Sequence, residues 1–179
     1  SELPIMDGSS KYFVEALEKV GAVEQEAERK VYVVKDVISY LDEATGSEIT
    51  IIPSESYSVT AMVDFGTKVL GTQNANMKNI SDFKSEISAC RTFSFLHELE
   101  TLLNNGLIKG GDLNNAIVYV DKEISTETMS SLQKAFNKDS ISVTENGILD
   151  NLTLHFPNEA ARHKLLDIVG DLSLIGTRI

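Results

Sequence analysis

The segment from residue 158 to 176, NEAARHKLLDIVGDLSLIG, is the feature that most constrains the fold of this 179-residue chain. Its apolar side chains recur at helical spacing, which predicts one amphipathic helix. The apolar set is Leu165, Leu166, Ile168, Val169 and Leu172. At about 100° of rotation per residue, the polar set falls within roughly 100° on another side of the helix. That set is His163, Lys164, Asp167 and Asp171. We therefore expect the helix to pack by one face and to gather an imidazole, an ammonium and two carboxylates on the other.

His163 and Asp167 lie one helical turn apart, so their side chains project in the same direction. Such a pair is able to bind one metal ion between an imidazole nitrogen and a carboxylate oxygen. The same spacing more often marks a solvated helix face that carries a surface ion pair. The spacing alone leaves both interpretations open.

The composition excludes several classes of protein. Hydrophobic residues make up 42% of the chain and charged residues 24%, which indicates one soluble globular domain with a core. A net charge of −11 argues against nucleic-acid binding and against attraction to an anionic membrane surface. No apolar run approaches the ~20 residues of a membrane span, and no signal peptide is apparent. We expect a protein of the cytosol.

Cys90 is the only cysteine, so the chain has no intrachain disulfide and fits a reducing compartment. A nucleophilic thiol would need a neighbouring His/Asn arrangement, and none is apparent. A small buried hydrophobe is the expected role.

Both ends of the sequence are expected to be cut. The chain opens without Met in an apolar ELPIMDG segment and stops at residues 177–179 with no polar tail. An excised domain is the expected explanation, although processing would give the same appearance.

Local patterns predict helices gathered around mostly antiparallel strands. Expected helices begin after Ser9 and end at Gly21, run from about 81 to 90, from about 95 to 105 and from 126 to 136, and follow Asn158 as an N-cap. Expected strands cover 31–34, 37–41, 47–52, 57–63 and 116–120, with a hairpin turn at 45–46 and a short strand-like piece at 140–144. This order indicates an α+β two-layer sandwich of a mostly antiparallel sheet with packed helices.

The sequence of the helix predicted at 158–176, called the motif helix below, resembles the metal-binding helix of the UDP-3-O-acyl-N-acetylglucosamine deacetylases. These are the zinc amidohydrolases of lipid A synthesis. Further segments agree with this family in order and approximate spacing. They are PIMDGS at 4–9, DF at 64–65, LG and Q at 70–73, RTF at 91–93, and NGL, GG and NA between 105 and 116. The resemblance implies that residues 1–179 form the second, C-terminal domain of a two-domain enzyme, with the N-terminal domain and the segment after 179 absent.

In this family two His and one Asp hold one zinc ion and leave a position open for water. The resemblance assigns His163 and Asp167 as metal ligands. It places the remaining His ligand and the Glu that serves as general base in the absent N-terminal domain. His97 and His155 do not lie in matching motifs, so we do not expect either to be a ligand.

The resemblance also implies catalytic roles. Thr92 matches a threonine whose hydroxyl helps the zinc to stabilise the oxyanion, and Lys164 matches a lysine near the sugar-diphosphate part of the substrate. Asp171 matches an aspartate that orients a catalytic His, which in the family lies beyond the end of this chain. Without the resemblance, the three residues would be a helix cap, a solvated lysine and an exposed charge.

Substrate contacts follow from the same resemblance. Phe65 and Phe93 match aromatics that pack on the nucleotide and sugar ends of the substrate, although either would also suit a core. Residues from about 95 to 121 match a small βαβ insert that bounds a passage for the acyl chain. The matching passage-lining positions are Leu99, Ile108, Gly111, Ala116 and Val118. The alternative is a satellite apolar cluster under a long loop.

The chain departs from the family pattern at three places. Lys109 and Asp112 change the mouth of the expected passage, and residues from about 121 to 151 form a longer connection than is usual. The usual approach to the motif helix is replaced by LHFP at 154–157. Some family members are fused to a hydroxyacyl-carrier dehydratase domain, so a fused parent is one expectation.

The complete enzyme would release acetate from UDP-3-O-acyl-N-acetylglucosamine, and the present chain is expected to be inactive alone. Its expected partners are this substrate and its own missing N-terminal domain, with no nucleic acid. The competing interpretation is a non-catalytic module that retains the fold. In that case the charged helix face would be a docking surface, and the apolar insert would hold a lipid or a partner helix.

Overall fold

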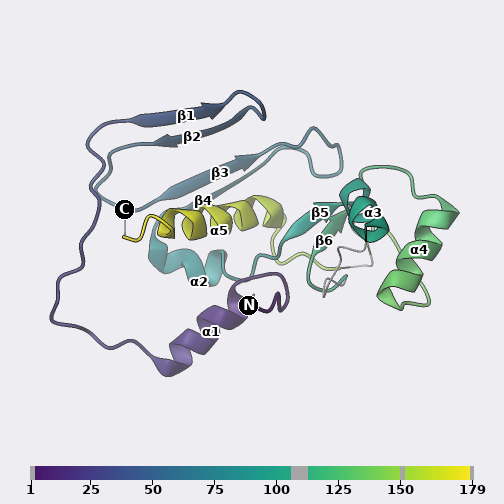
Figure 1. Cartoon of the computed structure of the whole chain (residues 1–179), viewed down its shortest axis with the longest axis horizontal. Helices are drawn as coiled ribbons and strands as arrows, with labels where there is room; N and C mark the ends of the chain where they lie inside the picture. The colour runs from purple at the N-terminus through teal and green to yellow at the C-terminus, as the bar shows by residue number, and fades with distance from the viewer. Residues whose placement is uncertain (1–2, 106–112, 150–151, 178–179) are drawn as a thin grey trace.

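The computed structural model describes residues 3–105, 113–149 and 152–177 (Figure 1). Within these ranges, helices combine with two antiparallel strand pairs and one parallel pair. The predicted α+β class is confirmed, and antiparallel pairing predominates among the described strands. No helix in the described ranges is long and apolar enough to cross a membrane.

One part of the core consists of a strand pair with the motif helix packed on it. Strand β3 (Val59–Val63) pairs with β4 (Gln73–Met77), and α5 (Glu159–Ser173) lies along the pair (Figure 1). Ala61 and Ala75 face each other in the register, and both are buried beneath the helix. Small side chains at this point allow the helix to pack close to the strands. Leu165 of α5 is fully buried here, as its apolar periodicity predicts.

A parallel βαβ unit stands beside this part of the core. Strand β5 (Phe93–Phe95) pairs with β6 (Ile117–Tyr119), and α3 (Leu96–Asn104) lies between them in the chain. All three residues of β6 are buried, which is typical of a strand covered on both faces. The Glu98 carboxylate accepts a hydrogen bond of 2.9 Å from the Phe95 N–H and so satisfies a donor at the start of α3. A parallel βαβ unit is therefore present where the sequence predicted one, and its description as an insert stays a prediction.

Helix α4 (Thr126–Phe136) confirms the predicted 126–136 helix. Ser125 Oγ accepts a hydrogen bond from the Thr128 N–H at its start, and Asn137 adopts a left-handed conformation at its end. Further along, Ile148 forms an antiparallel bridge with Tyr119 of β6. The described part of the predicted insertion at 121–151 thus packs against the βαβ unit.

The N-terminal elements carry apolar faces that the described part of the chain leaves uncovered. Helix α1 (Lys11–Val20) ends at Gly21 as predicted, yet none of its residues is buried. Leu17 is 72% exposed and Val20 86% exposed. Strands β1 (Ile38–Asp42) and β2 (Ser47–Ile51) form the predicted hairpin, and most of their residues are also exposed.

Several local predictions were wrong. Residues 31–34 form only an isolated bridge at Val31, and residues 140–144 form only one at Val143, because neither run has a neighbouring strand to pair with along its length. The helix predicted at 81–90 is a 3-10 turn, η1 (Ile80–Asp82), followed by the short α2 (Phe83–Glu86). Strand β4 was missed because its sequence, QNANM, is mostly polar.

Candidate functional site

His163 lies on α5 with only 8% of its surface exposed. Its Nδ1 is 3.0 Å from the carbonyl oxygen of Cys90. A carbonyl only accepts hydrogen bonds, so Nδ1 carries a proton, and in the neutral form of the ring Nε2 keeps its lone pair. That Nε2 is 3.6 Å from Oδ1 of Asp167, which is too long for a hydrogen bond. The pair thus presents two free donor atoms of the kinds that bind divalent metals.

The separation of these two atoms fits a shared metal ion. Zinc binds imidazole nitrogen and carboxylate oxygen at roughly 2.0–2.2 Å, so a tetrahedral ion holds two such atoms about 3.4 Å apart. In residues 3–105, 113–149 and 152–177, no group of three or more His, Cys, Asp and Glu side chains gathers in a way that could hold a metal. Catalytic zinc sites use three protein ligands, so His163 and Asp167 alone would not complete such a site.

Lys164 lies between Asp167, one of the two predicted ligands, and an aromatic ring. Its Nζ donates a hydrogen bond of 3.0 Å to Oδ2 of Asp167, and the same Nζ lies 5.6 Å from the centre of the Phe93 ring. The ammonium therefore binds Oδ2 of Asp167, and the other oxygen, Oδ1, is the one beside the imidazole of His163. Lys164 and Asp167 are both partly exposed, so this charged face is open to a ligand.

Phe65 and Phe93 belong to one aromatic cluster. Their ring centres are 5.6 Å apart in an edge-on arrangement, and Phe95 lies 5.5 Å from Phe65. Phe65 remains 46% exposed, whereas Phe95 is buried. The cluster thus combines the buried ring of Phe95 with the exposed ring of Phe65, while the Phe93 ring lies beside Lys164. The structure brings together five of the predicted site residues in a continuous series of contacts from Phe65 to His163.

Thr92 is held on both sides by backbone hydrogen bonds. Its N–H donates to the Gly8 carbonyl at 2.7 Å, and its carbonyl accepts from the Ile117 N–H at 2.8 Å. Gly8 has φ +77°, and a Cβ there would lie 1.9 Å from the carbonyl oxygen of Asn115. Only glycine permits this close approach. Thr92 comes directly before β5 rather than at a helix end, and it lies two residues from the carbonyl that contacts His163.

A buried ion pair, which the sequence did not reveal, ties this segment to the start of α5. Glu159 is fully buried, and its Oε1 accepts hydrogen bonds from the backbone N–H of Arg91 at 3.0 Å and from its Nε at 2.9 Å. Its Oε2 accepts from Arg91 Nη2 at 3.2 Å and from the His155 N–H at 2.6 Å. Burial alone would raise the pKa of Glu159, but these hydrogen bonds lower it below its ordinary value. Both residues belong to recognised motifs, yet no local pattern signals that they pair.

Cys90 is fully buried, as expected for a small hydrophobe. Burial, together with the negative charge of Glu159, raises the pKa of its thiol to about 12. The thiol therefore stays protonated at neutral pH, which argues against a nucleophilic role.

The remaining predicted residues lie in different surroundings. Asp171 is exposed in the last turn of α5. Leu99 and Val118 are buried in the core between α3, β6 and α4, and Ala116 is half-buried. Ile108 and Gly111 lie outside the described residues, so an acyl passage lined by these positions stays a prediction.

The two other histidines lie apart from the paired donors. His97 is exposed on α3 and pairs through Nδ1 with Asp121. His155 is exposed and contributes its backbone N–H to Glu159. Neither joins His163 and Asp167 in a group of possible metal ligands among the described residues, and the prediction that they are not metal ligands stays a prediction.

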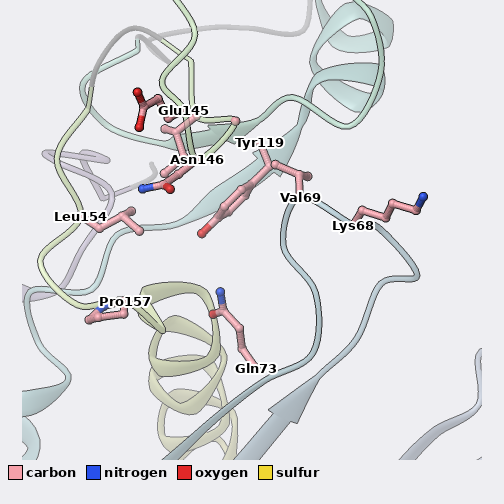
Figure 2. A pocket seen from close by; sticks show the side chains of 10 residues that line it. Lys68, Val69, Gln73, Tyr119, Glu145, Asn146, Leu154 and Pro157 are labelled. Atoms are coloured by element: carbon pink, nitrogen blue, oxygen red, sulfur yellow. The ribbon is translucent and has the colours of Figure 1, made fainter.

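A cavity of about 610 Å³ opens on another side of the aromatic cluster. Figure 2 shows the side chains of Tyr119 and Gln73 directed into it, with Leu154 and Pro157 on the opposite wall. Tyr119 Oη and Gln73 Oε1 are buried without a hydrogen-bond partner in the described part of the chain. Burial raises the pKa of Tyr119 to about 12, so its phenol is neutral. None of the predicted site residues that the structure describes lines this cavity.

Comparisons with known proteins agree with the motifs on this framework. The family model described as "LpxC: UDP-3-O-acyl N-acetylglycosamine deacetylase" matches residues 1–136 and 127–179. A protein of Bacteroides thetaiotaomicron named bifunctional enzyme LpxC/FabZ is 42% identical over 99% of this chain and 39% of its own length. A UDP-3-O-acyl-N-acetylglucosamine deacetylase of Syntrophotalea carbinolica is 36% identical over 99% of this chain and 50% of its own length. One of Myxococcus xanthus is 35% identical over 98% of this chain and 48% of its own length.

The fold and the paired side chains define an α+β domain with an imidazole and a carboxylate side by side on one helix. The chain belongs to the LpxC family of UDP-3-O-acyl-N-acetylglucosamine deacetylases. It spans half or less of the length of these curated relatives.

Proposed function

We propose that this chain is the second, C-terminal domain of a zinc-dependent amidohydrolase that removes acetate from UDP-3-O-acyl-N-acetylglucosamine in lipid A biosynthesis. The observation that carries the proposal is the His163–Asp167 pair. Its free Nε2 and Oδ1 are 3.6 Å apart within a chain that belongs to the family. Zinc, when bound, would polarise the acetamide carbonyl and lower the pKa of a water molecule.

The residues of this chain would hold the ion and the substrate. His163 would bind the ion through Nε2 and Asp167 through Oδ1, while Lys164 neutralises the other oxygen of Asp167. The exposed rim of Phe65 and the ring of Phe93 would support the sugar nucleotide, and the Lys164 ammonium between ring and carboxylate would face its diphosphate. A positive charge at that point suits an anionic ligand in an otherwise acidic protein.

Thr92 and Asp171 would act on the reacting groups. The backbone of Thr92 is held between Gly8 and Ile117, so a hydroxyl there would be pre-organised to donate to the developing oxyanion. Asp171 would orient the catalytic His that we expect beyond this chain. The third metal ligand and the general base would come from the N-terminal domain, so we expect the chain alone to be inactive.

The test uses the longer protein, with both expected flanking regions, and measures zinc-dependent release of acetate from the acylated sugar nucleotide. We expect His163→Ala and Asp167→Ala each to abolish release and to lower the zinc content of the purified protein. His97→Ala, a substitution of an exposed histidine outside the pair, is the matched control and should retain both.

Retained activity in His163→Ala and Asp167→Ala would overturn the proposal. Absence of activity in a folded, zinc-supplemented longer protein would favour the non-catalytic binding module instead. Turnover by the isolated 179 residues would contradict the expected division of the site between two domains.

A further inference from the structure

The contacts behind His163 suggest how its metal-binding nitrogen is kept free. The ring is buried, and its Nδ1 meets a backbone carbonyl rather than a side chain. The position of that carbonyl therefore decides which ring nitrogen carries the proton. Because Cys90 lies 73 residues away in the sequence, something other than local helix geometry must hold it there.

Arg91, the residue after Cys90, is held in place by its buried ion pair with Glu159. Arg91 donates to Glu159 from its backbone N–H, from Nε and from Nη2, and its Nη2 also donates to the Thr153 carbonyl at 2.8 Å. The backbone N–H of Arg91 and the carbonyl of Cys90 belong to the same peptide group. A hydrogen bond of 3.0 Å to the first of these atoms consequently orients the second.

Both ends of this arrangement sit on one helix. Glu159 opens α5, and His163 follows it by four residues, so the two side chains project from the same side of the helix. The peptide between Cys90 and Arg91 lies between them, with its N–H on the carboxylate and its carbonyl on the imidazole. One rigid helix thus holds the peptide by both of its polar groups.

We propose that Glu159 is a positioning residue, which orients the Cys90–Arg91 peptide and so keeps His163 in the tautomer whose Nε2 is free to bind metal. The inference rests on the metal-binding role proposed above for His163. It adds a residue that would not contact the ion, and it gives a role to a carboxylate without solvent access at the start of α5.

The test reads the tautomer directly and needs no substrate. Long-range ¹H–¹⁵N correlation spectra of the labelled 179-residue chain, recorded in a chelator, distinguish a protonated Nδ1 from a protonated Nε2. We expect His163 of the unmodified chain to carry its proton on Nδ1. In Arg91→Lys the charge remains, but one ammonium does not replace the forked contacts of the guanidinium, so we expect a mixture of both tautomers.

Glu159→Gln provides a second variant of almost unchanged volume. A carboxamide has one acceptor oxygen, so it is unable to accept at both positions that Arg91 and His155 occupy, and we expect the same mixture. The matched control is Arg162→Lys. Arg162 neighbours His163 on α5 and pairs with Glu86 at 3.1 Å, but it does not touch the Cys90–Arg91 peptide. The tautomer of His163 in Arg162→Lys should match that in the unmodified chain.

A zinc titration of the same samples gives a second readout at His163. Loss of the hydrogen bond that orients a metal-binding imidazole lowers metal affinity by about 10-fold to 100-fold. We expect Arg91→Lys and Glu159→Gln to weaken zinc binding by a factor in that range. Folded variants with an unchanged Nδ1–H tautomer would overturn the inference, as would a proton on Nε2 in the unmodified chain. If the tautomers change as expected but the longer protein releases no acetate, the positioning role stands and the proposed function fails.

Discussion

Substitution of Glu159 by alanine tests how much of the fold depends on one buried ion pair. The change removes an acceptor of four hydrogen bonds and leaves the Arg91 guanidinium, whose side chain is 9% exposed, without a counter-charge. Breaking a buried pair from one side costs about 3–5 kcal/mol, a large part of the roughly 5–15 kcal/mol that stabilises a typical domain. At ~2–4 °C per kcal/mol for a chain of this size, the melting temperature should fall by about 10 °C.

The assay is urea and thermal unfolding followed by circular dichroism. The matched control is Glu86→Ala, because Glu86 also pairs with an arginine, Arg162, but is 49% exposed, so its loss should cost at most about 1 kcal/mol. The double variant Glu159→Met/Arg91→Met should recover part of the stability, since no charge is then buried alone. A cost at Glu159 equal to that at Glu86 would refute the reasoning.

Three further predictions concern stability. Because the folded state lowers the pKa of Glu159, its contribution is complete at neutral pH and is lost as the pH falls through and below the ordinary glutamate range; urea midpoints measured from about pH 7 to about pH 3 should decline less steeply in Glu159→Gln. Gly8→Ala should add backbone strain of about 1–2 kcal/mol, because its φ is left-handed, and about 1–3 kcal/mol of overpacking against a backbone oxygen 1.9 Å from the new Cβ. The control Gly46→Ala, at φ +72° with open space around it, should add only the strain. Equal losses of unfolding free energy in urea would contradict the close approach at Gly8. Leu165→Ala should cost about 2–5 kcal/mol by the same measurement, and a cost below about 1 kcal/mol would show that α5 does not pack on β3 and β4 by this face.

Local features were predictable wherever a short stretch of sequence determines them. The bounds of α4 follow from Ser125 as an N-cap and from the apolar periodicity up to Phe136. The β1–β2 hairpin follows from Gly46, which adopts the left-handed conformation that its turn requires. These signals lie within a few residues of the structure that they specify, so they do not depend on the rest of the fold.

Predictions failed where a segment depends on a distant partner. Strand β4 forms from mostly polar residues because β3 pairs with it and α5 covers it. The sequence QNANM gives no local signal of either contact. The run 31–34 has strand-like composition but has no partner along its length in the described part of the chain. Strand formation thus followed pairing more closely than composition.

The candidate site shows the same division. Sequence spacing placed His163 and Asp167 on one face of a helix, because both lie on the same rigid element. The resemblance singled out Phe65, Phe93 and Lys164. Lys164 lies on the same helix as the pair, whereas Phe93 of β5 reaches it through the Lys164 ammonium, and Phe65 packs on Phe93. Spacing alone could not predict that Phe65 and Phe93 lie beside this helix, since long stretches of chain separate them from it.

The sequence by itself determined the α+β class, the amphipathic helix, the placement of His163 and Asp167 on one face of that helix, and the family, because periodicity and motif order are properties of the chain. Only the tertiary structure decided that Nδ1 of His163 is bound to the Cys90 carbonyl and that Glu159 is buried against Arg91. Those contacts join residues 73 and 68 positions apart. The physical reason is that a tautomer and a buried charge depend on which polar groups surround them, and the packing of separate elements brings those groups together.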